Sequence, residues 1–336
     1  MERHEDELMN ETGSEDIRRF EQRFQRVMDE IGRVLLGQED VVRGALIGLF
    51  AGGHVLMEGA PGLGKTLLAR CIARTLGCEY RRIQFTPDLM PSDVTGGNVF
   101  NQKTDAFEFH AGPVFTQVLL ADEINRAPAK TQASLLEGMS DRQVTVDGNT
   151  RPLPNPFFTL ATQNPVESEG TYPLPEAQLD RFMLKILVEH PTKEVEIKLL
   201  KSVLAGFDAS NLDAADLEKV LTAEEILELR AVARGVRVTE DLLKYIAEIV
   251  IRTRDHGSVD LGASPRASIA LLLCGQVVAA SEGRGYLVPD DIKEMAALVL
   301  RHRFLLQPDA ELEGITADEV VRTILMDIPV PGGERK

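Results

Sequence analysis

Residues 54–66 read His-Val-Leu-Met-Glu-Gly-Ala-Pro-Gly-Leu-Gly-Lys-Thr, and this stretch decides the fold. Its second part, Gly59–Thr66, matches the phosphate-loop pattern G-x-x-x-x-G-K-[ST] in full. The glycines let the backbone curl so that successive N–H groups point at phosphate oxygens, and the helix that follows adds its positive end. An apolar strand precedes the loop and an amphipathic helix follows it. The stretch therefore predicts a nucleotide-binding α/β fold.

The residue types of this loop also predict how a nucleotide is held. We expect Lys65 to bridge the β- and γ-phosphates and Thr66 to give its hydroxyl to magnesium, so that ATP and Mg2+ are the cofactors. The alternative is a chance glycine turn between a strand and a helix, which a full match in this context disfavours. The expected binding residues are Gly59, Ala60, Pro61, Gly62, Leu63, Gly64, Lys65, Thr66 and Leu67.

A second motif, Val118-Leu-Leu-Ala-Asp-Glu123, places two acids at the end of a buried strand. Asp122 is expected to hold magnesium through water, and Glu123 to polarise the attacking water as a general base. An apolar run followed by Asp-Glu is a weak signal alone. It gains weight because it follows a complete phosphate loop.

The next apolar run ends in Asn164, which we expect at the same edge of the sheet. An amide there can orient the attacking water or contact the γ-phosphate. Local sequence alone equally fits a strand-end turn before Pro165. The two preceding motifs favour the functional interpretation.

Short apolar runs alternate with helical patterns up to about residue 190, which predicts parallel strands joined by crossover helices. Two excursions, at 97–112 and 143–153, are typical of hairpins, the second because of its Asp-Gly turn. After His190-Pro191 strand signals vanish and helices follow one another. We therefore expect a disordered acidic N-terminus (1–13), a nucleotide-binding α/β domain (14–190) and an all-α domain (191–336). The predicted strands are 54–58, 80–86, 117–122, 157–162 and 183–188.

The composition limits the partners. The 336 residues carry a formal net charge of −16, which repels nucleic acid and anionic lipid as a mean field. The 3 cysteines form no CxxC pair and suggest free thiols in a reducing compartment. The N-terminal residues lack the apolar core of a signal peptide, and the apolar run at 44–57 is shorter than the roughly 20 residues of a membrane span. We expect a cytoplasmic protein without membrane insertion.

Three longer stretches make the pattern specific: Asp-Glu-Ile-Asn-Arg-Ala-Pro at 122–128, Ala-Thr-Gln-Asn-Pro at 161–165 and Gly-Thr-Tyr-Pro-Leu-Pro-Glu-Ala-Gln-Leu-Asp-Arg-Phe at 170–182. They resemble the MoxR family of AAA+ ATPases, and the similarity covers about residues 15–330. The resemblance implies a P-loop AAA+ core, a three-layer parallel α/β sheet domain, followed by an all-α lid. It also implies hairpins where the two excursions lie.

The resemblance assigns further site residues. By position, Asn164 resembles the sensor of the γ-phosphate, and Arg181 the arginine finger that reaches a neighbouring subunit's ATP. Arg266 resembles the second sensor from the lid, acting in its own or a neighbouring subunit. Residues Gly37 and Gln38 resemble the segment that lines the adenine pocket. Alternatives stay open: Arg126 could be the trans-acting residue, Arg181 could pair with Asp180 or Glu176, and Arg266 could be a solvated residue of a helix that begins at Pro265.

The resemblance also implies ATP hydrolysis to ADP and phosphate in a self-assembled ring, by family pattern a hexamer. The favoured use is a chaperone-like ATPase that remodels or matures a partner complex with a von Willebrand factor A-domain protein, often in metal or cofactor insertion. One alternative is a nucleic-acid motor of the same clade, which the acidic balance opposes. The other is a magnesium-chelatase-type subunit, although the stretches at 122–128 and 173–182 fit MoxR better.

Overall fold

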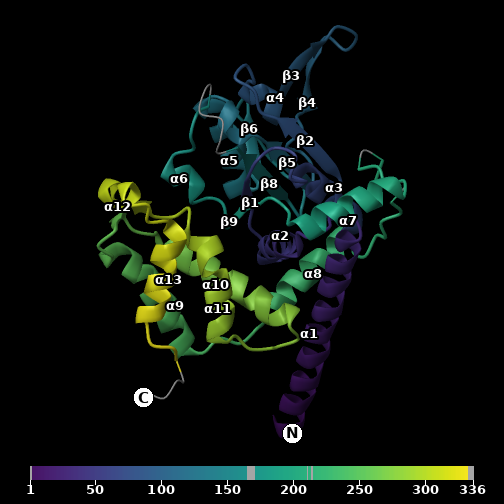
Figure 1. The fold of residues 1–336 in the computed structure, drawn as a ribbon. Helices are drawn as coiled ribbons and strands as arrows, with labels where there is room; N and C mark the ends of the chain where they lie inside the picture. The colour runs from purple at the N-terminus through teal and green to yellow at the C-terminus, as the bar shows by residue number, and fades with distance from the viewer. Residues whose placement is uncertain (1, 165–170, 210, 213–214, 332–336) are drawn as a thin grey trace.

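A computed structural model describes residues 2–164, 171–209, 211–212 and 215–331, with side chains from Gly13 onward. Pro165 and Gly170, which belong to the quoted stretches, lie outside the described residues. The centre is a five-stranded parallel sheet with the strand order β2-β5-β8-β1-β9 (Figure 1). All five strands were predicted, with bounds that differ by one or two residues. They are β1 (Val55–Glu58), β2 (Tyr80–Gln84), β5 (Val118–Asp122), β8 (Phe158–Gln163) and β9 (Leu184–Leu187).

Helices pack on both faces of this sheet. Successive side chains of a strand point to opposite faces, so each strand contributes residues to two cores. Val55 and Met57 of β1 belong to a core shared with α2 (Glu39–Ala51) and α3 (Lys65–Thr75). Leu56, between them, belongs to a second core with α4 (Pro91–Thr95), η1 (Ile124–Arg126) and α5 (Ala129–Asp141). The predicted three-layer arrangement is confirmed.

The two predicted hairpins are also confirmed. Strands β3 (Gly96–Asn101) and β4 (Ala106–Ala111) pair antiparallel, as do β6 (Gln143–Val146) and β7 (Asn149–Pro152). The β3–β4 hairpin projects from the body of the molecule (Figure 1). The hairpins contact each other: the Arg151 guanidinium lies 3.8 Å from the centre of the Phe109 ring, and Asn98 Nδ2 donates to Asp147 Oδ2 at 2.7 Å.

The N-terminal helix differs from the expectation. Helix α1 spans Glu2–Gly32, so the predicted disorder of residues 1–13 is not found for residues 2–13. This segment contains several residues of high helix propensity (Glu, Leu, Met, Arg), which favour the continuation of α1 through it. Figure 1 shows the N-terminal part of α1 pointing away from the body.

The helical part after the sheet packs directly on α1 and α2. Phe20 and Phe24 of α1 stack on each other, and both contact the ring of Phe50 of α2, in a core that continues to Cys274 and Val278 of α10 (Pro265–Ser281). The remaining elements are α6 (Glu176–Leu179), α8 (Ala223–Arg234), α9 (Glu240–Asp255), β10 (Val259–Leu261), α11 (Pro289–Leu300), β11 (Leu305–Leu306), α12 (Pro308–Leu312) and α13 (Ala317–Asp327). The short antiparallel pair β10–β11 corrects the expectation that strands vanish after residue 190.

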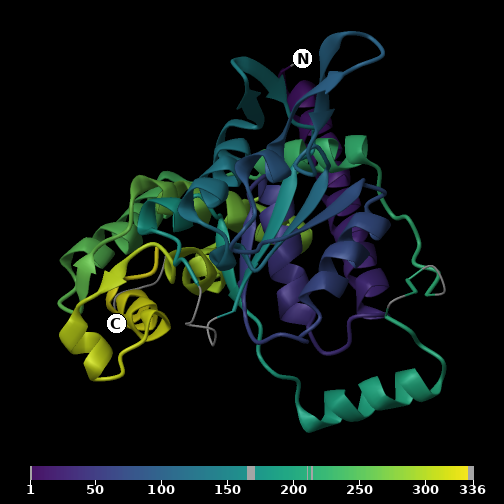
Figure 2. The ribbon, with the colours of Figure 1, turned by 90° about the horizontal axis from the view of Figure 1, so that it is seen from above.

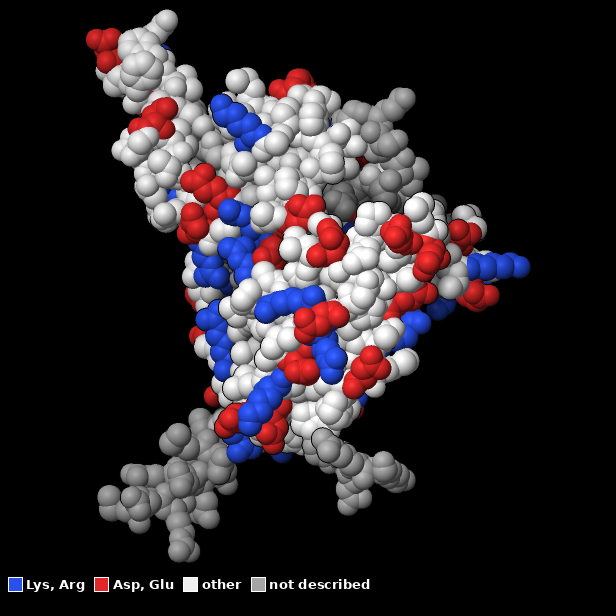
Figure 3. Space-filling model, turned by 90° about the vertical axis from the view of Figure 1, so that its left-hand side faces the viewer, with Lys and Arg blue, Asp and Glu red and all other residues white. Residues whose placement is uncertain are grey.

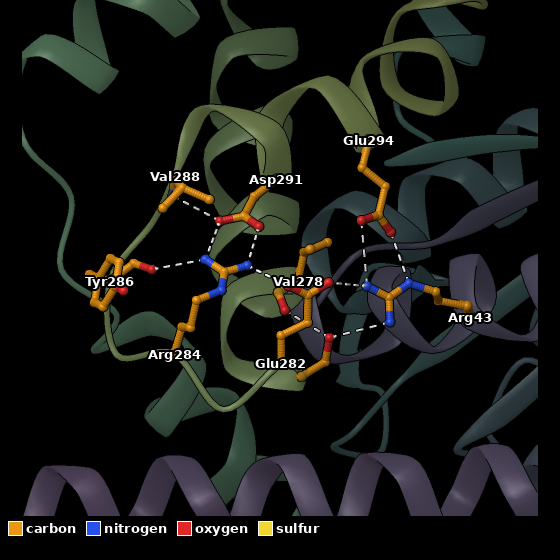
Figure 4. A network of polar contacts seen from close by, with 9 residues as sticks. Arg43, Val278, Glu282, Arg284, Tyr286, Val288, Asp291 and Glu294 are labelled. Carbon is orange, nitrogen blue, oxygen red and sulfur yellow. Dashed lines mark hydrogen bonds and ion pairs between the residues drawn. The ribbon is translucent and has the colours of Figure 1, made fainter. Parts of the chain in front are cut away.

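Ion pairs reinforce this junction (Figure 4). Arg43 of α2 donates to Glu294 of α11 at 2.8 Å and lies 3.3 Å from Glu282, which follows α10. Arg284 binds both carboxylate oxygens of Asp291 and also Glu282, and the hydrogen bonds to these two acids, those to Asp291 above all, raise the pKa of its guanidinium. The core and these pairs hold the lid against the α1–α2 layer, and Arg301 Nη1 also donates to the carbonyl oxygen of Lys185 in β9 at 3.3 Å.

Two features complete the outline. Helix α7 (Lys193–Leu204) has no buried residue, and it stands apart from the main body in Figure 2. Among the described residues, no helix combines the length and apolar character that a membrane crossing needs.

Candidate functional site

A cavity of about 1000 Å³ lies at the carboxyl end of the sheet strands. In open parallel sheets, ligands bind in the crevice outside this edge. The cavity is bounded by the phosphate loop, the ends of β2, β5 and β8, the segment that joins α1 to α2, and one side of α7. The predicted residues that line it are Gln38, Pro61, Gly62, Leu63, Gly64, Lys65, Thr66, Leu67, Asp122, Glu123 and Asn164.

The phosphate loop has the backbone shape that its glycines predict. Gly62 and Gly64 take left-handed φ values of 83° and 79°, which glycine adopts without steric cost. Gly59 comes close to the next strand, because a Cβ there would lie 2.5 Å from the carbonyl oxygen of Val188. Helix α3 begins at Lys65, so its N-terminal amides and its positive end face the cavity.

Lys65 is the principal cation of this loop. Its Nζ donates to the carbonyl oxygens of Gly59 and Ala60 at 2.6 and 2.7 Å. These two residues, which do not line the cavity themselves, thus position the ammonium group. Burial lowers the pKa of Lys65, while the nearby carboxylates of Asp122 and Glu123 raise it. Lys65 therefore lies within the electrostatic reach of both acids.

The two acids at the end of β5 have different surroundings. Asp122 is almost buried, and its Oδ1 accepts from Thr162 Oγ1 at 2.6 Å. Glu123 has a left-handed φ of 58°, which for a residue other than glycine costs about 1–2 kcal/mol. The hydrogen bond from Glu123 N to Thr162 Oγ1, at 2.8 Å, supports this conformation. Thr162 thus positions both acids, with the Glu123 carboxylate turned toward the cavity.

The donor set fits a magnesium ion held together with a phosphate. Mg2+ prefers oxygen ligands and binds proteins through one or two side chains while sharing substrate phosphates. The Thr66 hydroxyl and the Asp122 carboxylate supply such oxygens in one cavity. Within the described residues, no group of three or more His, Cys, Asp or Glu side chains is placed to hold a metal by itself.

The remaining predicted residues near the cavity have structural partners as well. Asn164 is buried at the end of β8. Gln38 Nε2 donates to the carbonyl oxygen of Leu63 at 2.8 Å, so it supports the phosphate loop. Gly37 has a φ of 69° and no room for a side chain, because a Cβ would meet Val195 of α7 at 2.5 Å.

The predicted arginines lie outside this cavity. Arg181 Nη1 donates to Leu136 O at 2.8 Å and to Ser140 Oγ at 2.6 Å, both on α5. It does not pair with Asp180, which instead accepts from Arg303 and Ser264. Arg266 is exposed in the first turn of α10.

Arg126 behaves differently from both, because it pairs with Glu123 of its own chain at 3.2 Å. The structure thus gives different surroundings to Arg181 and Arg126, the two candidates for the trans-acting residue, and to Arg266, the candidate second sensor. Arg181 follows α6 and donates to α5, Arg266 lies on the lid, and Arg126 lies beside the acid at the end of β5.

Among the side chains of the cavity that sequence analysis missed, two on β2 contact the acids of β5. Arg82 Nη2 lies 2.7 Å from Asp122 Oδ2, and Gln84 Nε2 donates to Glu123 Oε2 at 2.7 Å. The signal was present, since Arg82 and Gln84 are two residues apart and share one face of the strand. That face could be assigned to the site only once β2 was known to lie beside β5.

Comparisons with known proteins agree with this geometry. The profile of the "ATPase family associated with various cellular activities (AAA)" matches residues 54–184, and that of the "AAA lid domain" matches residues 251–324. The chain is 46% identical to the YeaC protein of Bacillus subtilis (strain 168), over 91% of this chain and 94% of that protein. It is 38% identical to "Chaperone MoxR1" of Mycobacterium tuberculosis, over 95% of this chain and 85% of that protein. A solved structure from Cytophaga hutchinsonii is 42% identical and superimposes with a TM-score of 0.88, covering 96% of this chain and 99% of that one.

Proposed function

The chain belongs to the MoxR family of AAA+ ATPases, and from this premise we propose that it uses ATP hydrolysis to remodel or mature partner protein complexes as a chaperone. The observation that carries the proposal is the single cavity in which a complete phosphate loop meets the acids of β5 and the amide of Asn164. The chaperone role is supported by the name of the mycobacterial relative.

In this proposal the site residues take distinct roles. Lys65 and the amides of Gly59–Thr66 bind the phosphates, while Thr66 and Asp122 hold Mg2+, which neutralises phosphate charge. Glu123 accepts a proton from the attacking water, and Asn164 orients that water or senses the γ-phosphate. The support is positional, because all of these side chains except Gly59 and Ala60 line one cavity.

We propose that Arg181 acts on the ATP of a neighbouring subunit in a ring, by family pattern a hexamer. Its distance from its own cavity supports this role, because its donors are directed to α5. Arg126 is the weaker candidate, since it already pairs with Glu123 of the same chain. Arg266, exposed on the lid, remains the proposed second sensor, in its own or in a neighbouring subunit.

We further propose the hairpins as the part that contacts the partner protein, with residues 14–190 as the motor domain and 191–336 as the lid. The β3–β4 hairpin carries exposed Phe100 and Phe107, with side chains 47% and 72% exposed and rings 5.4 Å apart. Exposed apolar residues that gather at one place mark interaction sites. A von Willebrand factor A-domain protein is the proposed partner, by family resemblance.

A nucleic-acid motor is the competing proposal, and charge opposes it. Figure 3 shows basic and acidic side chains interspersed over one face of the molecule rather than a continuous basic stripe there. The net charge of −16 points the same way.

The proposal is tested by trapping the ATP-bound state. Glu123→Gln, loaded with ATP, is used to capture proteins from native lysate, and mass spectrometry identifies them. The matched control is the double variant with Lys65→Ala, which should bind no ATP. A second variant, Phe100→Ser with Phe107→Ser, should lose the captured protein but keep basal ATPase activity, whereas Leu312→Ser, 87% exposed on the lid, should lose neither. Capture of nucleic acid, or of no protein in an ATP-dependent manner, would contradict the chaperone proposal.

A further inference from the structure

Arg82 holds the acid that is proposed to bind magnesium. Its Nε and Nη2 lie 3.1 and 2.7 Å from Asp122 Oδ2, and the other carboxylate oxygen of Asp122 accepts from Thr162. Charge-assisted contacts of this kind are among the stronger hydrogen bonds in proteins. Both oxygens of Asp122 are thus engaged by groups of the protein itself.

The position of Arg82 is set by the sheet. Strand β2 is the edge strand beside β5, and its register places Arg82 opposite Leu120 and Gln84 opposite Asp122. Arg82 therefore reaches forward along the edge to the acid. Its side chain is 46% exposed while that of Asp122 is 12% exposed, so the guanidinium lies at the rim of the cavity and can swing away.

Magnesium and this guanidinium need the same oxygen. A metal ion, or a water bound to it, takes lone pairs of the carboxylate, and Oδ2 already accepts from two N–H groups of Arg82. Two cations at one carboxylate also repel each other at close range. Oδ1 accepts one hydrogen bond, from Thr162, whereas Oδ2 accepts two from Arg82, so magnesium or its water can use Oδ2 only if Arg82 withdraws from it.

We propose that Arg82 is a positioning residue that competes with magnesium for Asp122, so that binding of the magnesium nucleotide displaces its guanidinium. The inference rests on the proposed role of Asp122 in magnesium binding. Arg82 also donates to Gln84 Oε1 at 2.5 Å, and Gln84 in turn binds Glu123. Displacement of Arg82 therefore removes one hydrogen-bond partner of Gln84, whose amide contacts Glu123, the proposed general base.

The test measures nucleotide binding rather than turnover. A fluorescent, non-hydrolysable ATP analogue is titrated against the full chain over a series of buffered free magnesium concentrations, for the wild type and for Arg82→Gln. The variant Arg82→Gln lacks the competing guanidinium. It should lower the free magnesium concentration at which analogue binding is half-maximal about tenfold, which corresponds to about 1.4 kcal/mol. Arg82→Lys keeps the charge but loses the contact through two N–H groups. Its half-maximal magnesium concentration should lie between those of the wild type and Arg82→Gln.

The matched control is Arg81→Gln, which removes the same charge from the same strand. Arg81 pairs with Glu79, and its alternate position on the strand turns it to the other face. Its half-saturation should equal that of the wild type. An unchanged or higher magnesium requirement in Arg82→Gln would overturn the inference. So would loss of nucleotide binding at saturating magnesium, since Arg82 would then be a phosphate ligand. A wild type that binds no nucleotide would refute the proposed function itself.

Discussion

Asp180 is the residue whose removal should most clearly loosen the lid. Its Oδ1 accepts from Arg303 Nε at 3.0 Å, and its Oδ2 accepts from Ser264 Oγ at 2.9 Å. Ser264 caps α10, and Arg303 follows α11, so one carboxylate of the segment after α6 holds two places on the lid. The perturbation is Asp180→Ala.

The magnitude follows from the burial of the pair. The Arg303 side chain is 2% exposed and that of Asp180 is 18% exposed, so removal of the acid leaves a buried cation without its counter-ion. Breaking such a pair costs about 3–5 kcal/mol. Burial already lowers the pKa of Arg303, and Asp180 opposes that shift. Because Arg303 keeps the carbonyl of Met183 as an acceptor at 2.9 Å, we expect the lower end, about 3 kcal/mol.

Urea unfolding measures this cost as the change in the free energy of unfolding at a constant m-value. Glu176→Ala, an exposed acid on α6, is the matched control and should change stability by less than about 0.5 kcal/mol. The double variant with Arg303→Met should recover part of the loss, because the unpaired buried charge is then gone. A loss below about 0.5 kcal/mol in Asp180→Ala would refute the reasoning.

Other perturbations address the site and the core. Glu123→Gln should slow hydrolysis at least about 100-fold, the scale of general-base catalysis, with nucleotide affinity unchanged in a binding titration. Arg181→Ala should lower turnover by about 10³-fold or more, and mixing it with Glu123→Gln subunits should restore some turnover; no recovery at any ratio, despite demonstrated mixed assembly, would exclude action in trans. His54 is buried, and burial lowers its pKa to about 4 from 6.5, so its contribution to stability is complete above pH 6.5 and is lost as the pH falls toward 4. Since Nδ1 accepts from Thr159 N and Nε2 donates to Met139 O, protonation breaks a native hydrogen bond. Between pH 7 and pH 5, the free energy of unfolding of His54→Gln should therefore decrease by about 2 kcal/mol less than that of the wild type. An unchanged pH dependence would contradict this role of His54.

Much of the fold was predictable because its signals are local. The phosphate loop is a run of consecutive residues whose glycines adopt left-handed backbone angles, and its neighbours are an apolar strand and a helix. Two helices of the lid begin with capping boxes, at Thr222 and Thr316, and each box forms within one helical turn. Strand-end acids and amides were assigned to one edge because parallel strands end at a common edge. The structure places Asp122, Glu123 and Asn164 together in one cavity at that edge.

The tertiary structure determines the contacts between residues that are far apart in sequence. Spacing of two or four residues shows which side chains share a face, but it does not show which strand lies beside which. Only the order β2-β5-β8 brings Arg82 to Asp122, 40 positions away. Only the docking of the lid brings Arg303 to Asp180, 123 positions away, and leaves Arg181 directed at α5. These partners depend on how complete layers pack, which no local pattern encodes.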